Sequence, residues 1–198
     1  MKRALALALA LMLLTGAALA EPFAFRNGVA WGMNDLELLA AEGEPEPGYG
    51  PGMTSTDTYG DDLVYMYFYD VSAAGAKADL TYTLRRGALF MIAYIFKEDA
   101  ISWKKLVASY TLKYGEPQPP ELDDVADRLE VLIGPDGDIA SEFEAYLETE
   151  YMATWRTEDT CILAVHQDGS HFVAYFGLSE MDRQMAADPE MALNTDGI

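Results

Sequence analysis

The only two histidines, His166 and His171, flank the tetrapeptide QDGS. Asp168-Gly169 is a strong signal for a two-residue hairpin turn, which places both histidines directly opposite each other on one face. Their Cβ atoms would then lie about 4.5–5.5 Å apart, so that both imidazoles could reach one transition metal. A stable zinc site takes three or four protein ligands, and the sequence identifies no others. We interpret His166 and His171 as solvated residues at a hairpin end, with a metal site as the alternative hypothesis and no cofactor indicated.

Carboxylates are the most abundant chemical groups, with 33 Asp and Glu against 13 Lys and Arg. The densest run covers residues 116–150, where Arg128 is the single base. Asp136 and Asp138 resemble the start of a calcium loop, but the following residues fail the EF-hand pattern at its glycine and bidentate glutamate positions. Solvated helix faces explain the run. A hydrolase that uses paired carboxylates stays open, because a sequence does not show which acids converge in a cleft.

Three tyrosines, Tyr65, Tyr67 and Tyr69, alternate with apolar residues in the segment LVYMYFYD. This period of two predicts a strand with one apolar face and one tyrosine-lined face. Because tyrosine joins a broad apolar ring to a hydrogen-bonding hydroxyl, such a face suits contact with a protein or a glycan. The alternative is that a helix or the loops of the sheet cover it. The same patch would be extended, if the strand registers allow, by Tyr82, Trp155 and Tyr175.

Cys161 is the single cysteine, so an intramolecular disulfide is excluded. Its neighbours in TCILAV indicate a buried strand, where a cysteine behaves as a small apolar residue. His166 lies five residues away and therefore on the opposite side of that strand. The chain also lacks a Gly-x-Ser-x-Gly nucleophile elbow and the glycine-rich loops that hold phosphates. Nucleophilic catalysis and nucleotide binding are thus disfavoured.

The first twenty residues have the pattern of a secretory signal peptide. Lys2 and Arg3 form a basic start, residues 4–14 are an unbroken apolar run, and Ala18-Leu19-Ala20 fits the small-x-small cleavage pattern. The apolar run is shorter than the roughly 20 residues that span a bilayer, so we expect cleavage. A lipoprotein would need cysteine where Glu21 stands. The sequence predicts a secreted, periplasmic or cell-envelope protein that is not lipid-anchored and is not inserted in the membrane after cleavage.

The charge balance argues against two classes of partner. The whole chain carries a formal charge of −20, and removal of Lys2 and Arg3 with the signal makes it −22. Nucleic acid is disfavoured because its phosphates bind basic surfaces. An anionic membrane surface is disfavoured for the same reason. A protein or a glycan remains as the expected partner.

The remaining chain predicts short helices and antiparallel strands. Asn34 and Glu37 form a capping box at the start of a helix that ends at Gly43. Residues 45–61 are rich in glycine and proline and predict a loop. A three-stranded meander follows, with Arg86-Gly87 as one turn.

A second helix, capped by Asp99, ends at Gly115. A helical insertion covers residues 119–150, and three further strands end near residue 178. After Leu178 the chain becomes polar, so residues 179–198 predict a flexible tail.

The two halves share a pattern. Each helix ends in a related motif, GEPEP from Gly43 and GEPQP from Gly115, and each precedes three strands. We therefore expect one α+β domain over residues 21–178, with possible repeat units 31–97 and 99–178. Its mainly antiparallel sheet or sheets would contain about six strands, in two helix-plus-three-strand units with helices packed on one face.

These motifs carry a resemblance. The opening FAFRNGVAWGM and the segment KYGEP resemble a group of uncharacterised exported bacterial proteins. In the order of its elements the chain is also similar to SmpA/OmlA-type outer-membrane-assembly lipoproteins and to the beta-lactamase inhibitor protein, a tandem of two helix–sheet modules. It departs from the former in having no lipidated cysteine and from the latter in having no paired cysteines. The resemblance implies a module that acts by contact across a sheet face.

The sequence thus predicts an exported, non-catalytic binding or inhibitory module. An exported hydrolase with paired carboxylates and a structural envelope protein without a discrete ligand are the alternatives. Exposed aromatic residues on a sheet face would favour binding. Two carboxylates facing across a pocket, with one in an apolar setting that raises its pKa, would favour hydrolysis.

Overall fold

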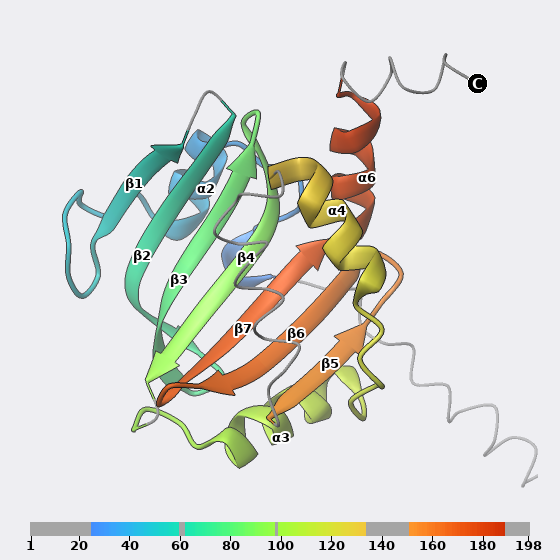
Figure 1. Ribbon diagram of the computed structural model, residues 1–198. Coiled ribbons are helices and arrows are strands. Elements are labelled where there is room, and N and C mark those ends of the chain that lie inside the picture. The colour runs from blue at the N-terminus through green and yellow to red at the C-terminus, as the bar shows by residue number, and fades with distance from the viewer. Residues whose placement is uncertain (1–24, 60–61, 98, 134–150, 189–198) are drawn as a thin grey trace, which may run out of the picture.

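Seven antiparallel strands form one sheet in the computed structural model, which describes residues 25–59, 62–97, 99–133 and 151–188 (Figure 1). The strand order is β1-β2-β3-β4-β7-β6-β5, so β1 and β5 are the edges. The strands are β1 (Thr54–Tyr59), β2 (Leu63–Ala73), β3 (Ala76–Arg85), β4 (Ala88–Lys97), β5 (Met152–Arg156), β6 (Thr160–Gln167) and β7 (Ser170–Gly177). The predicted α+β class with an antiparallel sheet is confirmed, with seven strands in place of about six.

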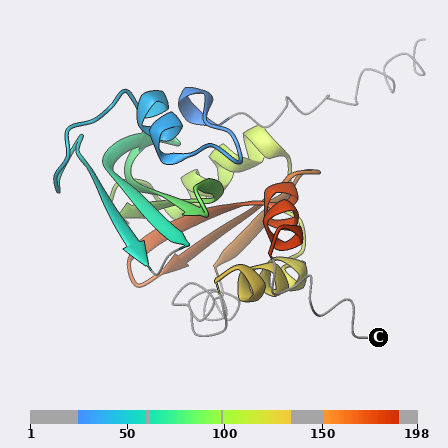
Figure 2. The same cartoon turned by 90° about the horizontal axis from the view of Figure 1, so that it is seen from above.

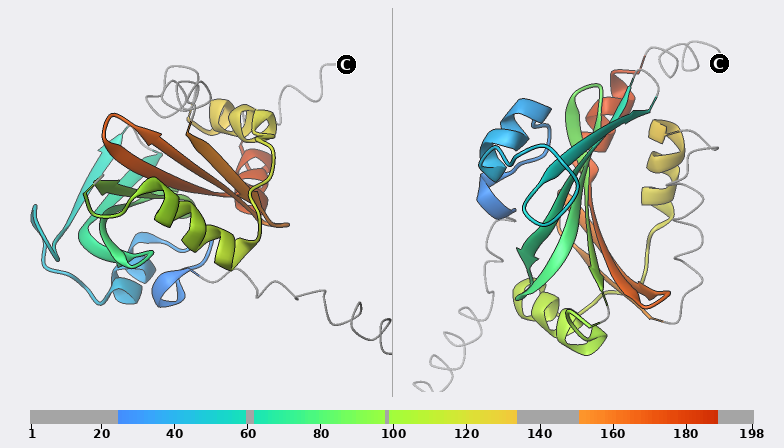
Figure 3. Two further views of the ribbon diagram at one scale, coloured as in Figure 1. Left: turned by 90° about the horizontal axis from the view of Figure 1, so that it is seen from below. Right: turned by 90° about the vertical axis from the view of Figure 1, so that its left-hand side faces the viewer.

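Helices cover both faces of the sheet, as Figures 2 and 3 show. The described helices are the short 3-10 helix η1 (Arg26–Gly28), α2 (Asp35–Glu42), α3 (Trp103–Tyr114), α4 (Asp123–Ile133) and α6 (Leu178–Ala186). α2 and α3 bury Leu38, Leu106 and Tyr110 against one face, which we call the first face. α4 and α6 bury Leu129 and Met181 against the opposite, second face.

Our expectation that the helices pack on one face is therefore wrong for the whole domain. It holds for α2 and α3, the two helices that open the expected repeat units. α4 belongs to the expected insertion and α6 to the expected tail. Each has an apolar stripe of its own, which is buried on the second face together with β4, β6 and β7.

The two meanders meet in the middle of the sheet. β4 closes the first and β7 the second, and these strands pair over Met91–Lys97 and Ser170–Phe176. The second half contains α3 on the first face and the three strands β5–β7. The first half contains α2 on the same face and four strands, because β1 adds an edge strand beside β2. The duplication itself stays a prediction.

Several local predictions are confirmed. Asn34 and Glu37 form the reciprocal capping box of α2, and Gly43 ends the helix with a left-handed φ of 87°. Both predicted hairpin turns use two residues with positive φ, Arg86-Gly87 and Asp168-Gly169. This geometry matches the right-handed twist of the flanking strands.

Three local expectations are wrong. The expected loop over 45–61 contains β1, whose sequence TSTDTY is too polar to show a strand periodicity. α3 starts after Ser102, which makes no side-chain capping bond, and Asp99 does not cap it. The expected tail begins with α6, in which Leu178 and Met181 are buried. The expected signal peptide, residues 134–150 of the expected insertion and residues 189–198 lie outside the described residues.

Candidate functional site

The tyrosines of β2 form a row on the second face. Tyr65, Tyr67 and Tyr69 are each half-buried, whereas Met66 and Phe68 between them are buried on the first face. The alternation predicted from the sequence is therefore confirmed.

Exposed tyrosines of neighbouring segments lengthen this row. The ring of Tyr59 on β1 meets that of Tyr65 edge to face, with centroids 5.1 Å apart. At the other end, the rings of Tyr49 and Tyr69 lie 6.2 Å apart. Tyr49 and Tyr59 are 79% and 56% exposed. We call these five residues the tyrosine ladder: Tyr49, Tyr59, Tyr65, Tyr67 and Tyr69.

Acidic and hydroxyl groups of β1 surround the ladder. Asp57 lies opposite Tyr65 and Ser55 opposite Tyr67 in the β1–β2 register. The Ser55 hydroxyl is 2.9 Å from that of Tyr69. Partial burial raises the pKa of Tyr67, and the negative charge of Asp57 adds to the effect. The ladder is an aromatic surface with acidic character.

None of the described helices covers the ladder. α4 and α6 lie over the part of the second face formed by β4, β6 and β7 (Figure 1). From β2, only Leu63 packs against the residues that these helices bury. The ladder therefore lies at the end of the sheet away from α4 and α6.

The expected extension of the patch is wrong. Tyr82 pairs with Met66 in the β2–β3 register, so its side chain lies on the first face. Trp155 and Tyr175 flank Ile162, Trp155 from β5 and Tyr175 from β7, and both lie on that face as well. All three are core residues, with exposed fractions of 0%, 1% and 7% for Tyr82, Trp155 and Tyr175. The structure does not bring them together with the tyrosines of β2.

The two histidines lie as the hairpin predicts, but one of them is buried. His166 and His171 are paired across β6 and β7, and their Nδ1 atoms are 2.9 Å apart. His171 is 1% exposed, and its Nε2 lies 2.8 Å from the carbonyl oxygen of Ile101. Because only an N–H can donate to that carbonyl, Nε2 of His171 carries a proton.

This arrangement uses Nδ1 of His166 and both ring nitrogens of His171 in hydrogen bonds within the protein. Within residues 25–59, 62–97, 99–133 and 151–188, no group of three or more His, Cys, Asp or Glu side chains is placed to hold a metal ion. Our interpretation of both histidines as solvated is wrong for His171. A metal site at this pair stays a hypothesis, with His166 and His171 as its two candidate ligands.

Cys161 is buried on the second face, and burial raises the pKa of its thiol to about 11. A thiol in this state is a poor nucleophile at neutral pH. Arg156 pairs with Cys161 in the register and forms an ion pair with Asp124 of α4. Arg128 joins Asp124 to Asp182 of α6. These carboxylates are neutralised by arginine and tie α4 to β5 and α6.

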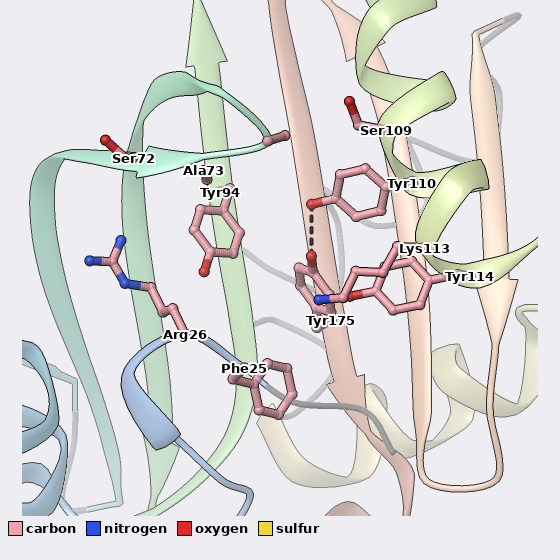
Figure 4. Close-up of a pocket in the computed structure, with 11 residues that line it drawn as sticks. Phe25, Arg26, Ser72, Ala73, Tyr94, Ser109, Tyr110, Lys113, Tyr114 and Tyr175 are labelled. Atoms are coloured by element: carbon pink, nitrogen blue, oxygen red, sulfur yellow. Dashed lines mark hydrogen bonds between the residues drawn. The ribbon is translucent and has the colours of Figure 1, made fainter. Parts of the chain in front are cut away.

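A cavity of about 300 Å³ opens on the first face between η1, α3 and strands β4 and β7 (Figure 4). Phe25, Tyr94, Tyr114 and Tyr175 supply aromatic walls, and Arg26 and Lys113 supply positive charge. No motif in the sequence predicts this cavity. The only signal was the opening FRNG, which we interpreted as the start of a structural unit.

A charged network holds the Arg26 side of the cavity. Arg26 Nη2 lies 3.0 Å from Glu42 Oε2, and Tyr82 donates a short hydrogen bond to the other carboxylate oxygen. The Asn27 side chain donates to Glu42 as well, at 3.0 Å. Glu42, whose side chain is 2% exposed, is thus fully engaged and fixes the position of η1.

Within the described residues, no helix is both long and apolar enough to span a membrane. Comparisons of the chain with protein-family models, with curated proteins and with solved structures found no match.

Proposed function

We propose that this protein is an exported, non-catalytic binding module that contacts a partner protein through the tyrosine ladder. The observation that supports this most is the ladder itself: five tyrosines in a row on a part of the sheet that no described helix covers. Protein interfaces are enriched in tyrosine, which gives a large contact area at a small cost in side-chain entropy.

The charges suggest which surface fits. Asp57 lies within the ladder, and the chain carries 33 acidic against 13 basic residues. A partner with a basic surface would be attracted by this field and would associate faster at low salt. We therefore propose that the partner is a protein with a basic surface. A glycan partner, which the sequence also allows, is the alternative that the test distinguishes.

The carboxylate hydrolase gains less support. The 300 Å³ cavity has no carboxylate among its lining residues. A smaller cavity of about 160 Å³ beside Arg156 and Cys161 has Glu121 as its single carboxylate. Neither has the two facing carboxylates that hydrolysis of this kind needs.

The test compares two tyrosines of equal exposure. Tyr59, in the ladder, is 56% exposed, and Tyr151, at the start of the β5 edge, is 53% exposed. The immobilised wild-type protein and the variants Tyr59→Ser, Tyr67→Ser and Tyr151→Ser are incubated with a cell-envelope extract, and retained proteins and glycans are quantified. Loss of a contact residue at the centre of an interface costs about 2 kcal/mol or more.

We expect to recover one protein that is released by raised salt. The Tyr151→Ser variant should retain it as the wild type does, whereas Tyr59→Ser should retain less of it and Tyr67→Ser at least tenfold less. Retention of this protein by all variants alike would contradict the role of the ladder. Selective retention of a glycan would show that the partner is a glycan and not a protein. Circular dichroism of each variant controls for folding.

A further inference from the structure

The two edges of the sheet differ in how much of their backbone is already paired. β5 forms one edge, where the Gln118 N–H donates to the Thr154 carbonyl oxygen at 2.8 Å and the Thr154 hydroxyl donates back to Gln118. β1 forms the other edge, where a short segment pairs with Thr54 alone. The Thr54 N–H donates to the Glu46 carbonyl oxygen at 3.1 Å, and the Gly48 N–H donates to the Thr54 carbonyl oxygen at 2.8 Å. Among the described residues, no further strand covers the rest of β1.

The contacts of Thr54 show which backbone groups of β1 point away from β2. Backbone groups alternate in direction along a strand, so the N–H and C=O groups of Thr56 and Thr58 point outward as those of Thr54 do. Both residues are exposed, and no described residue forms a backbone hydrogen bond with these outward groups. Natural edge strands are usually protected by lysine, by proline or by a covering segment. Within the described part of the chain, positions 56–59 have none of these and are open to another strand.

The charge around this open edge favours a basic strand. Between Arg26 and Lys77 the chain contains no lysine or arginine, and α2, β1 and β2 all fall within that stretch. The Asp57 side chain lies on the second face, beside the ladder and within the open part of the edge. On an added antiparallel strand, the Cβ atom opposite that of Asp57 would lie about 4.5–5.5 Å away on the same face. A lysine or arginine at that position would reach the carboxylate.

We propose that β1 accepts an extended, basic segment of the partner protein as an eighth strand. The backbone of this segment pairs with the outward N–H and C=O groups of Thr56 and Thr58, and its basic side chain pairs with Asp57. The apolar stem of that side chain packs on the ring of Tyr59, which is exposed. The added strand lies beside the tyrosine ladder, so the proposal rests on the proposed function and names how the partner binds.

The experiment uses the full chain, isotopically labelled, and three defined hexapeptides. Lys-Val-Lys-Val-Lys-Val can form a basic strand, Glu-Val-Glu-Val-Glu-Val reverses the charge, and Lys-Pro-Lys-Pro-Lys-Pro keeps the charge but lacks N–H donors at alternate positions. Each peptide is titrated while the amide resonances of the protein are followed by NMR. We expect the first peptide to shift the Thr56 and Thr58 amides saturably and to bind about tenfold more tightly than the other two. Equal binding of the two lysine peptides, or no saturable binding of the first, would overturn strand addition.

Two variants of one position separate the backbone from the side chain. Thr58→Pro removes an outward N–H and leaves the bonds between β1 and β2, and proline is tolerated on edge strands. Thr58→Val keeps the N–H and is the matched control. We expect Thr58→Pro to weaken binding of the first peptide about tenfold and Thr58→Val to leave it unchanged. Equal effects would contradict backbone pairing, and circular dichroism shows whether each variant is folded.

A second pair of variants tests the charge and does not depend on the folding of the proline variant. Asp57→Asn should weaken binding of the first peptide several-fold. Asp35→Asn, at an exposed position of α2 in the same acidic stretch, changes the net charge equally and should leave binding unchanged. Equal effects would mean that the attraction is general and would overturn recognition at Asp57. Shifts of the Thr56 and Thr58 amides that depend on protein concentration without peptide would assign the edge to a second copy of the chain and overturn the basic partner strand.

Failure of strand addition and failure of the proposed function give different results. In the cell-envelope experiment, a protein that Tyr67→Ser loses but Thr58→Pro retains like the wild type would overturn strand addition and leave the ladder as the binding surface. A protein that all variants retain alike would contradict the role of the ladder, and the peptide titration tests the edge independently of that result.

Discussion

Gly177 lies directly against the indole ring of Trp31. A Cβ atom at position 177 would come within 2.5 Å of Trp31 Cδ2, which is much closer than non-bonded carbon atoms approach in proteins. The φ of Gly177 is −81°, so the backbone does not require glycine and the requirement is for space alone. The indole is held in place because its Nε1 donates to the Thr160 hydroxyl at 3.1 Å and Phe25 packs edge to face against it.

We therefore predict that Gly177→Ala destabilises the protein by about 1–3 kcal/mol, the usual cost of overpacking. Thermal unfolding measures the effect. Trp31→Ala removes the atoms that clash, so the double variant Trp31→Ala/Gly177→Ala should lose clearly less than the sum of the two single variants. Additive losses would show that the two residues do not interact.

The Asp124 cluster makes a pH-dependent contribution to stability. Hydrogen bonds from Arg156 lower the pKa of Asp124 below its ordinary value of 3.8, with a further contribution from Arg128. A carboxylate with a lowered folded pKa stabilises the fold above its unfolded pKa, and this contribution is lost as the pH falls through the folded pKa.

Asp124→Asn should accordingly lower the free energy of unfolding by about 1 kcal/mol at pH 7, since the side chain is partly exposed. The difference from the wild type should disappear near pH 2. Asp123→Asn is the matched control, because Asp123 is the exposed neighbour in the first turn of α4. Urea unfolding at both pH values provides the measurement, and an equal loss at pH 2 and pH 7 would contradict the electrostatic explanation.

Local signals predicted most of the fold. The capping box of Asn34, the turn at Asp168-Gly169 and the alternation around Met66 each depend on a few neighbouring residues, and each is present. β1 was missed because an edge strand needs little apolar sequence. The helix after Leu178 was missed because its apolar stripe is short.

The candidate sites depend on distant residues, which explains the errors there. Whether Tyr82 joins Tyr65 on a face is decided by strand register, and a shift of one residue reverses the face. The cavity combines Arg26, Tyr94 and Lys113 from three separate elements. No spacing in the sequence indicates that these elements meet.

The His171 side chain connects β7 to the segment before α3. Its Nε2 donates to the Ile101 carbonyl oxygen, and both residues are buried. His171→Ala removes this hydrogen bond and should destabilise the protein by about 1–3 kcal/mol. His166→Ala should cost less, because His166 is half-buried.

If the two histidines form no metal site, zinc affinity measured by competition with a chelator will be equal for the wild type and the double variant. A large loss of zinc affinity in the double variant would support the metal hypothesis instead.

Four buried tyrosines should make the protein sensitive to alkali. Burial raises the pKa values of Tyr82, Tyr94, Tyr110 and Tyr175 well above the ordinary 10.0. Because a raised folded pKa means that the unfolded state loses its proton first, the stabilisation is complete below about pH 10 and declines above it. Tyrosinate absorbance and circular dichroism should therefore change together in one alkaline unfolding step.

Tyr94→Phe isolates this effect, since the Tyr94 hydroxyl forms no hydrogen bond within the described residues. The variant should keep its stability at pH 7 and unfold at a higher pH than the wild type, because phenylalanine has no proton to lose in the unfolded state. Tyr49→Phe, at a position 79% exposed, is the control and should leave the alkaline midpoint unchanged. Equal midpoints for wild type and Tyr94→Phe would mean that ionisation of Tyr94 does not contribute to alkaline unfolding, and the transition would then have to be driven by the other three buried phenols.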